Sequence, residues 1–244
     1  MDAPALEPLD TDFASVLCVV AHPDDIEYGL SAAVHRWTGA GIPVTYFLLT
    51  RGEAGIDSMP PELAGPAREA EQREAGRRVG VDVVDFGEWA DGRVEAGLAL
   101  RRDIAREIRR RRPEFVVTQT YADRFGAGMV NQADHRAVGL ATLDAVADAG
   151  NRWLHPELAA EGLEPWEGVR MLGFAGSPTP NRWVDVTGEH FEAGVHSLEA
   201  HAAYNDALPD TFPKPRELLT WVLGMGGQAA GVEHAVTLDV VDRR

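Results

Sequence analysis

The chain has 244 residues, a length that predicts one large domain with a sizeable core. Apolar residues make up 45% and charged residues 25%, as in globular proteins, which argues against a disordered, collagen-like or coiled-coil chain. Asp and Glu number 39 against 23 Lys and Arg, and the net charge of −16 repels polyanions, so we expect a small-molecule partner, no nucleic acid and no membrane.

The N-terminal segment 1–12 is acidic and contains proline without any periodic pattern, which predicts a loose acidic tail. It carries no basic region followed by an apolar stretch of signal-peptide length, and no run of about 18 apolar residues follows in the chain. Cys18 is the only cysteine and lies in an apolar run, so a disulfide framework and a four-cysteine metal centre are excluded. We expect a cytoplasmic protein, and a homo-oligomer is compatible with its sequence.

Strand and helix patterns alternate through the first part of the chain. The predicted elements, in chain order, are a strand at 16–21, a helix at 26–38, a strand at 44–49, a helix at 67–79, a strand at 81–86, a helix at 98–112, a strand at 114–120 and a helix at 135–147. This alternation predicts an α/β fold, a Rossmann-like, mostly parallel sheet with helices on both faces. In such sheets ligands bind beyond the carboxyl ends of the strands, so we expect the crevice at the loops that follow Val20, Leu49, Phe86 and Thr118.

The pattern of the remaining third of the chain predicts a smaller irregular C-terminal region within the same single domain, 13–244. It contains a stretch with Pro and Trp at 153–166, strands at 169–174, 183–186 and 235–240, and a helix at 189–204. Gly224 to Ala229 fits a dinucleotide-binding pattern, but too few residues follow for the helix, strand and ribose-binding acid of such a site. Neither an internal repeat nor a long linker indicates a second domain.

The loop after the first strand concentrates ionisable side chains on a strand-to-helix turn, in the sequence His22-Pro-Asp-Asp-Ile-Glu27. Adjacent carboxylates repel and raise each other's pKa, and a divalent metal among them would remove this cost. One imidazole and one carboxylate from the turn, with a second histidine, would make a three-ligand site with an open position for water. Of the eight histidines, His135 is the best placed, because it follows the strand at 114–120. Capping of the next helix accounts for one aspartate but not for the set.

The chain resembles the LmbE/PIG-L family of zinc-dependent N-deacetylases from about Val16 to Ala149. The resemblance rests on the motifs at 21–29, 49–53, 68–71, 91–92 and 134–135, of which Ala-His-Pro-Asp-Asp-Ile-Glu-Tyr-Gly at 21–29 is the most specific. It implies a hydrolase that removes an N-acyl group, most often acetyl, from an amino sugar or a glycoside carrying one. Two alternatives stay open: a metallo-amidase acting on a thiol conjugate or an acylated secondary metabolite, and a catalytically inactive metal-binding relative.

By position, the resemblance implies that His22, Asp25 and His135 bind zinc, with Fe²⁺ or Co²⁺ as alternative metals. It assigns Asp24 as the general base that accepts a proton from a zinc-activated water. Asp134, in the same motif as His135, is a further catalytic candidate.

Positions that contact sugar hydroxyls in the family correspond to Glu53, Arg68 and Asp91, whose acceptor or bidentate chemistry suits vicinal hydroxyls. Gln132 stands where family members commonly have a histidine that stabilises the oxyanion and donates a proton. A glutamine can donate a hydrogen bond but cannot protonate a leaving amine. We therefore expect Asp24 to return the proton that it accepts, and Gln132 to keep only the hydrogen bond.

Overall fold

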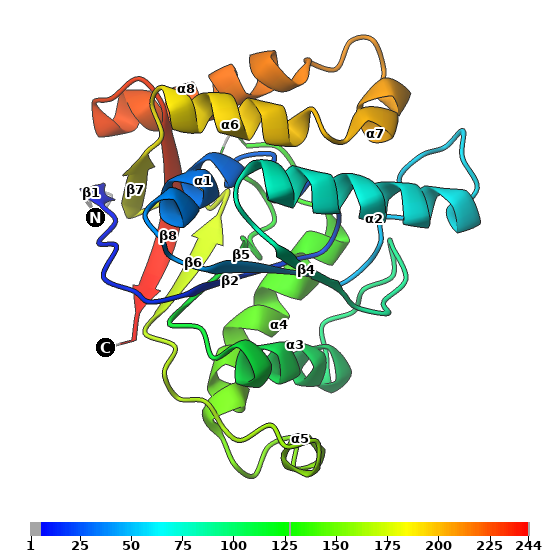
Figure 1. Ribbon diagram of the computed structural model, residues 1–244, viewed down its shortest axis with the longest axis vertical. Coiled ribbons are helices and arrows are strands. Elements are labelled where there is room, and N and C mark those ends of the chain that lie inside the picture. Colours follow the sequence, from blue (N-terminus) through cyan, green and yellow to red (C-terminus); the bar gives the residue numbers. More distant parts are fainter. Residues whose placement is uncertain (1–5, 127, 244) are drawn as a thin grey trace.

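The computed structural model describes residues 6–126 and 128–243, which form one eight-stranded sheet with helices on both faces (Figure 1). The strands are β1 (Glu7–Pro8), β2 (Val16–Val20), β3 (Val44–Leu48), β4 (Val83–Phe86), β5 (Phe115–Gln119), β6 (Met171–Ala175), β7 (Arg182–Asp185) and β8 (Ala235–Asp242). Their order across the sheet is β1-β7-β8-β6-β5-β2-β3-β4. β8 is antiparallel to β6 and β7, and all other neighbouring pairs are parallel. The predicted α/β fold with a mostly parallel sheet is confirmed.

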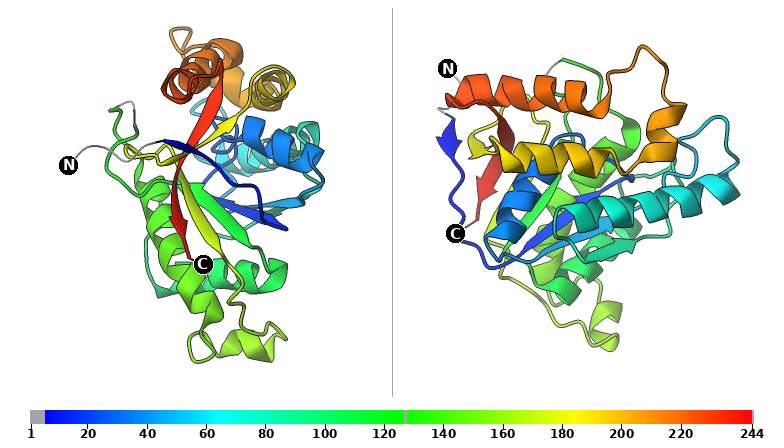
Figure 2. Two further views of the ribbon diagram at one scale, coloured as in Figure 1. Left: turned by 90° about the vertical axis from the view of Figure 1, so that its left-hand side faces the viewer. Right: turned by 45° about the horizontal axis from the view of Figure 1, so that its top comes forward.

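The helices in the described residues are α1 (Ser31–Gly39), α2 (Pro61–Arg78), α3 (Leu98–Arg111), α4 (Ala133–Gly150), α5 (Glu157–Ala160), α6 (Glu189–Leu198), α7 (Ala202–Ala207) and α8 (Pro215–Ala230). Helices α1, α2, α6 and α8 lie on one side of the sheet, and α3 and α4 lie on the other (Figure 2). Cys18 belongs to the apolar cluster of the first side, and its neighbours Leu17 and Val19 belong to that of the second. Because both faces are covered, the apolar run of β2 is continuous.

The bounds of three helices differ most from the sequence prediction. The helix expected at 67–79 begins at Pro61, because proline is favoured in the first turn of a helix. The helix expected at 26–38 begins only at Ser31, since 21–30 forms turns. The helix expected at 189–204 is split into α6 and α7 by the segment 199–201.

Helix α8 is missing from the sequence prediction, because its glycines have low helix propensity. The glycines allow a close approach to the chain that leads into β8. A Cβ atom on Gly226 would lie 2.2 Å from the carbonyl oxygen of Ala235, and one on Gly227 would lie 2.3 Å from that of Glu233. Gly226 and Gly227 therefore allow the helix to pack closely against this part of the chain.

Part of the segment 1–12 is attached to the sheet. Glu7 and Pro8 pair with β7, and Leu9 is buried in the core. Residues 1–5 lie outside the described part of the chain, and the division into a tail and a single domain 13–244 stays a prediction. Among the described residues, no helix combines the length and the apolar character needed to cross a membrane.

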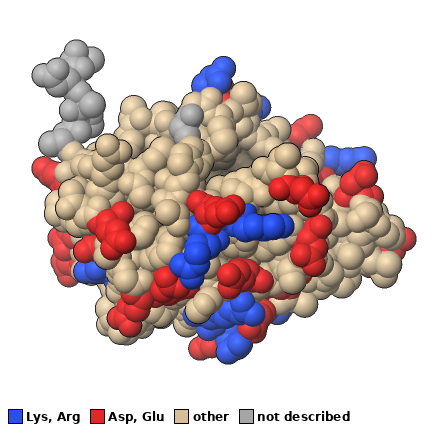
Figure 3. Space-filling model, turned by 90° about the horizontal axis from the view of Figure 1, so that it is seen from above, with Lys and Arg blue, Asp and Glu red and all other residues tan. Residues whose placement is uncertain are grey.

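The surface above α2, α6 and α8 carries acidic and basic side chains close together (Figure 3). On these helices, Arg216 pairs with Glu192 at 2.6 Å, and Arg78 pairs with Glu74 at 2.9 Å. These guanidinium groups are therefore engaged with carboxylates of their own chain.

The strand order reverses between β2 and β5. The chain runs from β2 to β3 and β4 on one side, and then returns through α3 to β5 on the other side of β2. Open parallel sheets bind ligands beyond the carboxyl ends of the strands at such a point. The turn after β2 and the loop between β5 and α4 begin there.

Candidate metal centre

Three side chains converge at the carboxyl ends of β2 and β5. His22 and Asp25 lie in the turn after β2, and His135 lies in the first turn of α4. One nitrogen or oxygen atom of each lies within 4.8 Å of the others. His22 is 6% exposed and Asp25 is 9% exposed, so the cluster is largely shielded from water. The structure therefore brings together the three residues predicted as metal ligands.

Backbone N–H groups fix the carboxylate of Asp25. Its Oδ2 accepts hydrogen bonds from the N–H of Ala21 at 3.0 Å and of His22 at 2.7 Å. Its Oδ1 lies 3.0 Å from Nε2 of His135, which lies 3.2 Å from Nδ1 of His22. Oδ1 therefore faces the imidazole of His135, while Nδ1 of His22 lies 3.6 Å from Oδ2.

Two aspartates fix the ring of His22 from its far side. Its Nε2 lies 3.0 Å from Oδ1 of Asp91 and 3.3 Å from Oδ2 of Asp134. Asp134 also accepts backbone N–H groups from Gly92 at 2.8 Å and Val94 at 3.2 Å. With its Nε2–H donated to these carboxylates, His22 directs Nδ1 toward Asp25 and His135, and a metal bound there would take the lone pair of Nδ1 in place of a proton. His22, Asp91 and Asp134 also lie close enough to hold an ion. Because both aspartates contact Nε2 of His22, we interpret them as residues that orient its ring.

Asn131 fixes the ring of His135 in the same manner. Its Oδ1 lies 3.1 Å from Nδ1 of His135. Its Nδ2 donates to the carbonyl oxygens of Thr120 at 2.7 Å and Ala122 at 2.9 Å, which determines the orientation of the amide. Nδ1 of His135 is then the donor to Asn131, and the lone pair of Nε2 points to the cluster.

The electrostatics of the cluster favour a cation. Burial lowers the pKa of His22, but the charge of Asp25 and the hydrogen bonds that the imidazole donates to the surrounding aspartates outweigh it and hold this pKa well above its usual value. Burial raises the pKa of Asp25, but His135 and His22 outweigh it and hold this pKa well below its usual value. The negative charge that favours the protonated imidazole of His22 would also attract a divalent ion, so the ion and the imidazole proton would compete for this site. Two imidazole nitrogens and one carboxylate oxygen suit zinc, iron or cobalt.

Asp24 lies beside the cluster with its carboxylate held by an arginine. Its Oδ2 accepts a hydrogen bond from Nη2 of Arg68 at 2.9 Å. Burial raises the pKa of Asp24 to about 7, although the charges of Arg68 and His201 oppose this rise. A carboxyl group with such a pKa can both accept and release a proton near neutrality.

The three residues predicted to bind sugar hydroxyls make contacts within the protein. Arg68 is 3% exposed, donates to the carbonyl oxygens of Gly52 and Pro23 as well as to Asp24, and lies 4.1 Å from the ring centre of Tyr204. Glu53 accepts the backbone N–H of Asp91 at 2.8 Å, and Asp91 lies against His22. Their positions favour support of Asp24 and His22, and sugar binding by any of them stays a prediction.

Gln132 is exposed and lies immediately before α4. Its side chain does not cap the helix, so it is not held by the first turn of α4. Its predicted hydrogen bond to an oxyanion stays a prediction.

Sequence reasoning missed Asn131 and Gln72, which hold His135 and Asp24. The one signal for Asn131 is its position four residues before His135, a spacing that places side chains on one side of a helical turn. Gln72 gives no such signal, because it lies 48 residues from Asp24 in the sequence.

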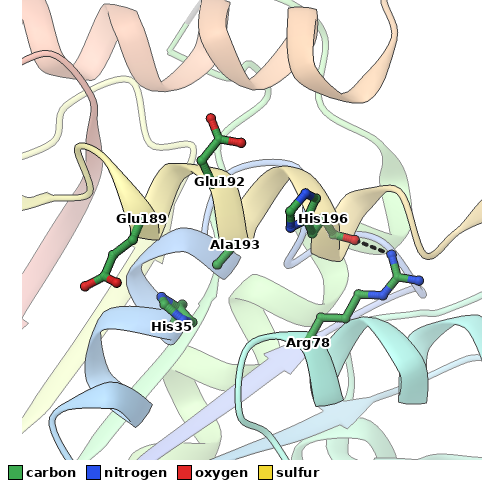
Figure 4. Close-up of a pocket in the computed structure, with 6 residues that line it drawn as sticks. All are labelled: His35, Arg78, Glu189, Glu192, Ala193 and His196. Atoms are coloured by element: carbon green, nitrogen blue, oxygen red, sulfur yellow. Dashed lines mark hydrogen bonds between the residues drawn. The ribbon is translucent and has the colours of Figure 1, made fainter.

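A separate groove of about 610 Å³ lies over α1, α2 and α6 (Figure 4). Its lining residues are His35, Arg78, Glu189, Glu192, Ala193 and His196. None of the predicted site residues lines it, so we do not associate it with the metal centre.

Comparison with known proteins identifies the family. The family model PIG-L, described as GlcNAc-PI de-N-acetylase, matches residues 17–146. The chain belongs to the PIG-L family. The matched span runs from β2 into α4 and includes all three clustered ligand candidates.

Two curated relatives are named as deacetylases. Diacetylchitobiose deacetylase of Thermococcus kodakarensis is 29% identical over 198 residues, which cover 80% of this chain and 71% of that protein. A 1D-myo-inositol 2-acetamido-2-deoxy-alpha-D-glucopyranoside deacetylase of Kineococcus radiotolerans is 30% identical over 282 residues, which cover 97% and 72%. The structure of N,N'-diacetylchitobiose deacetylase from Pyrococcus horikoshii matches the fold with a TM-score of 0.85 at 22% identity, over 95% of this chain and 85% of that one. Family and relatives together make this chain an enzyme.

Proposed function

We propose that this PIG-L family chain is a zinc-dependent N-deacetylase that removes an acetyl group from an N-acetylated amino sugar or a related glycoside. The observation that carries the proposal is the convergence of His22, His135 and Asp25. Nε2 of His22 and Nδ1 of His135 already contact other side chains, and Oδ2 of Asp25 accepts backbone N–H groups. The remaining ligand atoms of the three residues lie close together. That arrangement is suited to hold a metal ion with an open position.

A zinc ion held by these three residues would polarise the substrate carbonyl and acidify water. Asp24 accepts a proton from the attacking water and passes it to the nitrogen as the C–N bond breaks. The pKa of Asp24, raised by burial to about 7, suits both steps. Arg68 holds the carboxylate in place, while Asp134 and Asp91 keep the His22 ring oriented.

The substrate class is proposed from the named activities of the relatives. One is a diacetylchitobiose deacetylase and another acts on an inositol-linked 2-acetamido sugar. Both names describe an acetamido group on a sugar. An N-acetylated amino sugar is therefore the first substrate class to test for this chain.

The test combines metal analysis with a substrate panel. We expect about one zinc per chain and release of a primary amine from N-acetylglucosamine glycosides. His135→Ala should abolish both, whereas Thr142→Val, a buried change in α4 away from the cluster, should preserve both. Full metal occupancy in His135→Ala would disprove this ligand set. Turnover confined to acylated thiol conjugates or acylated secondary metabolites would reassign the substrate class, and metal binding without any turnover would indicate an inactive relative.

A further inference from the structure

Asp24 has a backbone conformation that an aspartate rarely adopts. Its φ is +83°, in the left-handed region that favours glycine. Such a conformation persists only where its surroundings determine it. It also sets the direction in which the Asp24 carboxylate leaves the chain, so whatever fixes the backbone fixes the carboxylate.

Two hydrogen bonds hold the peptide groups of Asp24. Its carbonyl oxygen accepts the N–H of Tyr28 at 3.1 Å, a bond within the same turn. Its own N–H donates to Oε1 of Gln72 at 2.9 Å. Gln72 lies on α2 and is fully buried, so the second bond ties the turn to a rigid helix.

The amide of Gln72 is oriented by a buried carboxylate. Nε2 of Gln72 lies 3.2 Å from both oxygens of Glu27, which is itself fully buried. The NH₂ group of Gln72 donates to the carboxyl oxygens of Glu27, so this end of the amide faces Glu27. Its oxygen then faces Asp24, where an N–H donor needs an acceptor.

Glu27 is anchored by the C-terminal third of the chain. Nε2 of His201 lies 3.4 Å from its Oε2, and Oγ of Ser197 lies 3.4 Å from its Oε1 and 3.0 Å from the carbonyl oxygen of Ala75. Ser197 and His201 are fully buried, and they lie at the end of α6 and in the segment that joins α6 to α7. The contacts form one series from α6 through Glu27 and Gln72 to the backbone of Asp24.

We propose that Gln72 is a positioning residue for the deacetylation: its amide, oriented by Glu27, holds Asp24 in the left-handed turn that aims the carboxylate. The inference rests on the proposed role of Asp24 as the base. Arg68 fixes the carboxylate end of the same residue, so the two contacts determine both parts of Asp24.

The test is the substitution Gln72→Met, which fills the same space without the hydrogen bonds. We expect kcat to fall by about 10- to 100-fold, because misplacement of a reacting group by 1 Å can cost about 10²-fold in rate. KM should change by less than about twofold and the zinc content should remain about one per chain, because neither depends on the direction of Asp24. Thr142→Val is the matched control: its buried hydroxyl has no hydrogen-bond partner among the described residues, and kcat should be unchanged.

A double-mutant cycle distinguishes positioning from a general loss of structure. If Gln72 acts through Asp24, Gln72→Met should not lower the residual kcat of Asp24→Asn any further. Multiplicative losses in the double variant would overturn the proposal, as would unchanged kcat in Gln72→Met. Gln72→Asn, one methylene shorter, keeps a polar group in the buried site and repeats the test if Gln72→Met does not fold. If Asp24→Asn retains full kcat, the proposed function of Asp24 fails, independently of the result for Gln72.

Discussion

The parallel part of the sheet and the C-terminal third contribute differently to the metal centre. All three ligand candidates lie on the turn after β2 or on α4, where strand ends and helix starts meet. The described residues of the C-terminal third provide no ligand candidate, but His201 lies against Glu27 and the ring of Tyr204 lies over Arg68. The first region therefore supplies the ligand candidates and the side chains that orient them, and the second contacts two of the supporting residues, Glu27 and Arg68. Substitutions in the two regions should have different kinetic signatures.

The largest effect is expected in the first region, at Asp24. Asp24→Asn should lower kcat by about 10²–10⁴-fold, the range for a missing general base, because the amide cannot accept the proton of water. Zinc content should remain near that of the unchanged enzyme, since Asp25, not Asp24, faces the imidazoles. Single-turnover rates and elemental analysis on one sample measure both quantities. Loss of zinc together with activity would make Asp24 a ligand instead.

Substitution of Asn131 tests how much the orientation of His135 contributes to zinc binding, separately from His135 as a ligand. Asn131→Ala should weaken zinc affinity by about 10- to 100-fold, the usual cost of losing a group that orients a ligand, because His135 loses its fixed tautomer. Competition with a chelator measures the affinity. Asn205→Ala is the matched control, since Asn205 donates to the carbonyl oxygen of Leu198 in the C-terminal third. Equal weakening in both variants would contradict the division between the two regions.

Tyr204 tests the C-terminal contribution to the base. Tyr204→Leu removes the aromatic face beneath the Arg68 guanidinium and should lower kcat about 3- to 10-fold, as expected for loss of about 1 kcal/mol of cation–π attraction. Tyr204→Phe keeps the ring and should keep the rate. If Tyr204→Phe lowers kcat as much as Tyr204→Leu does, the rate depends on the hydroxyl group of Tyr204 and not on the stacking of its ring.

The smallest effect concerns stability and pH at His201. Burial opposes the charged form, but the hydrogen bond and charge of Glu27 outweigh it, and the pKa of His201 is raised in the folded state. The resulting stabilisation is fully present below the ordinary pKa of about 6.5 and is lost as the pH rises through the raised value. The Tm difference between the unchanged protein and His201→Gln should therefore shrink with rising pH, by a few degrees, since 1 kcal/mol is about 2–4 °C at this size. A difference that is constant from pH 6 upward would contradict this account.

Local patterns in the sequence predict much of the parallel sheet. The continuous apolar run of β2 and the charged turn behind it, at 16–27, indicate both a buried strand and a site at its end. The C-terminal third follows less from local pattern, because packing decides it: α8 is helical although Gly224, Gly226 and Gly227 disfavour a helix.

The contacts of the candidate site could be predicted only in part. His22, Asp25 and His135 meet, as expected from strand order. The motif at 68–71 predicts that Arg68 binds sugar hydroxyls, which stays a prediction, and its burial against Asp24 depends on how α2 docks, which no short motif specifies. Gln72 depends on the same docking.

The position of β8 has a consequence for biosynthesis. It is the last strand of the chain, yet it lies between β6 and β7 in the sheet. During synthesis from the N-terminus, β2 to β6 can assemble first, and with them the turn and helix that carry the ligand candidates. β7 and β1 have no strand to join them to the rest of the sheet until residues 235–242 have left the ribosome, so β7 and the edge strand β1 wait for that segment to be made.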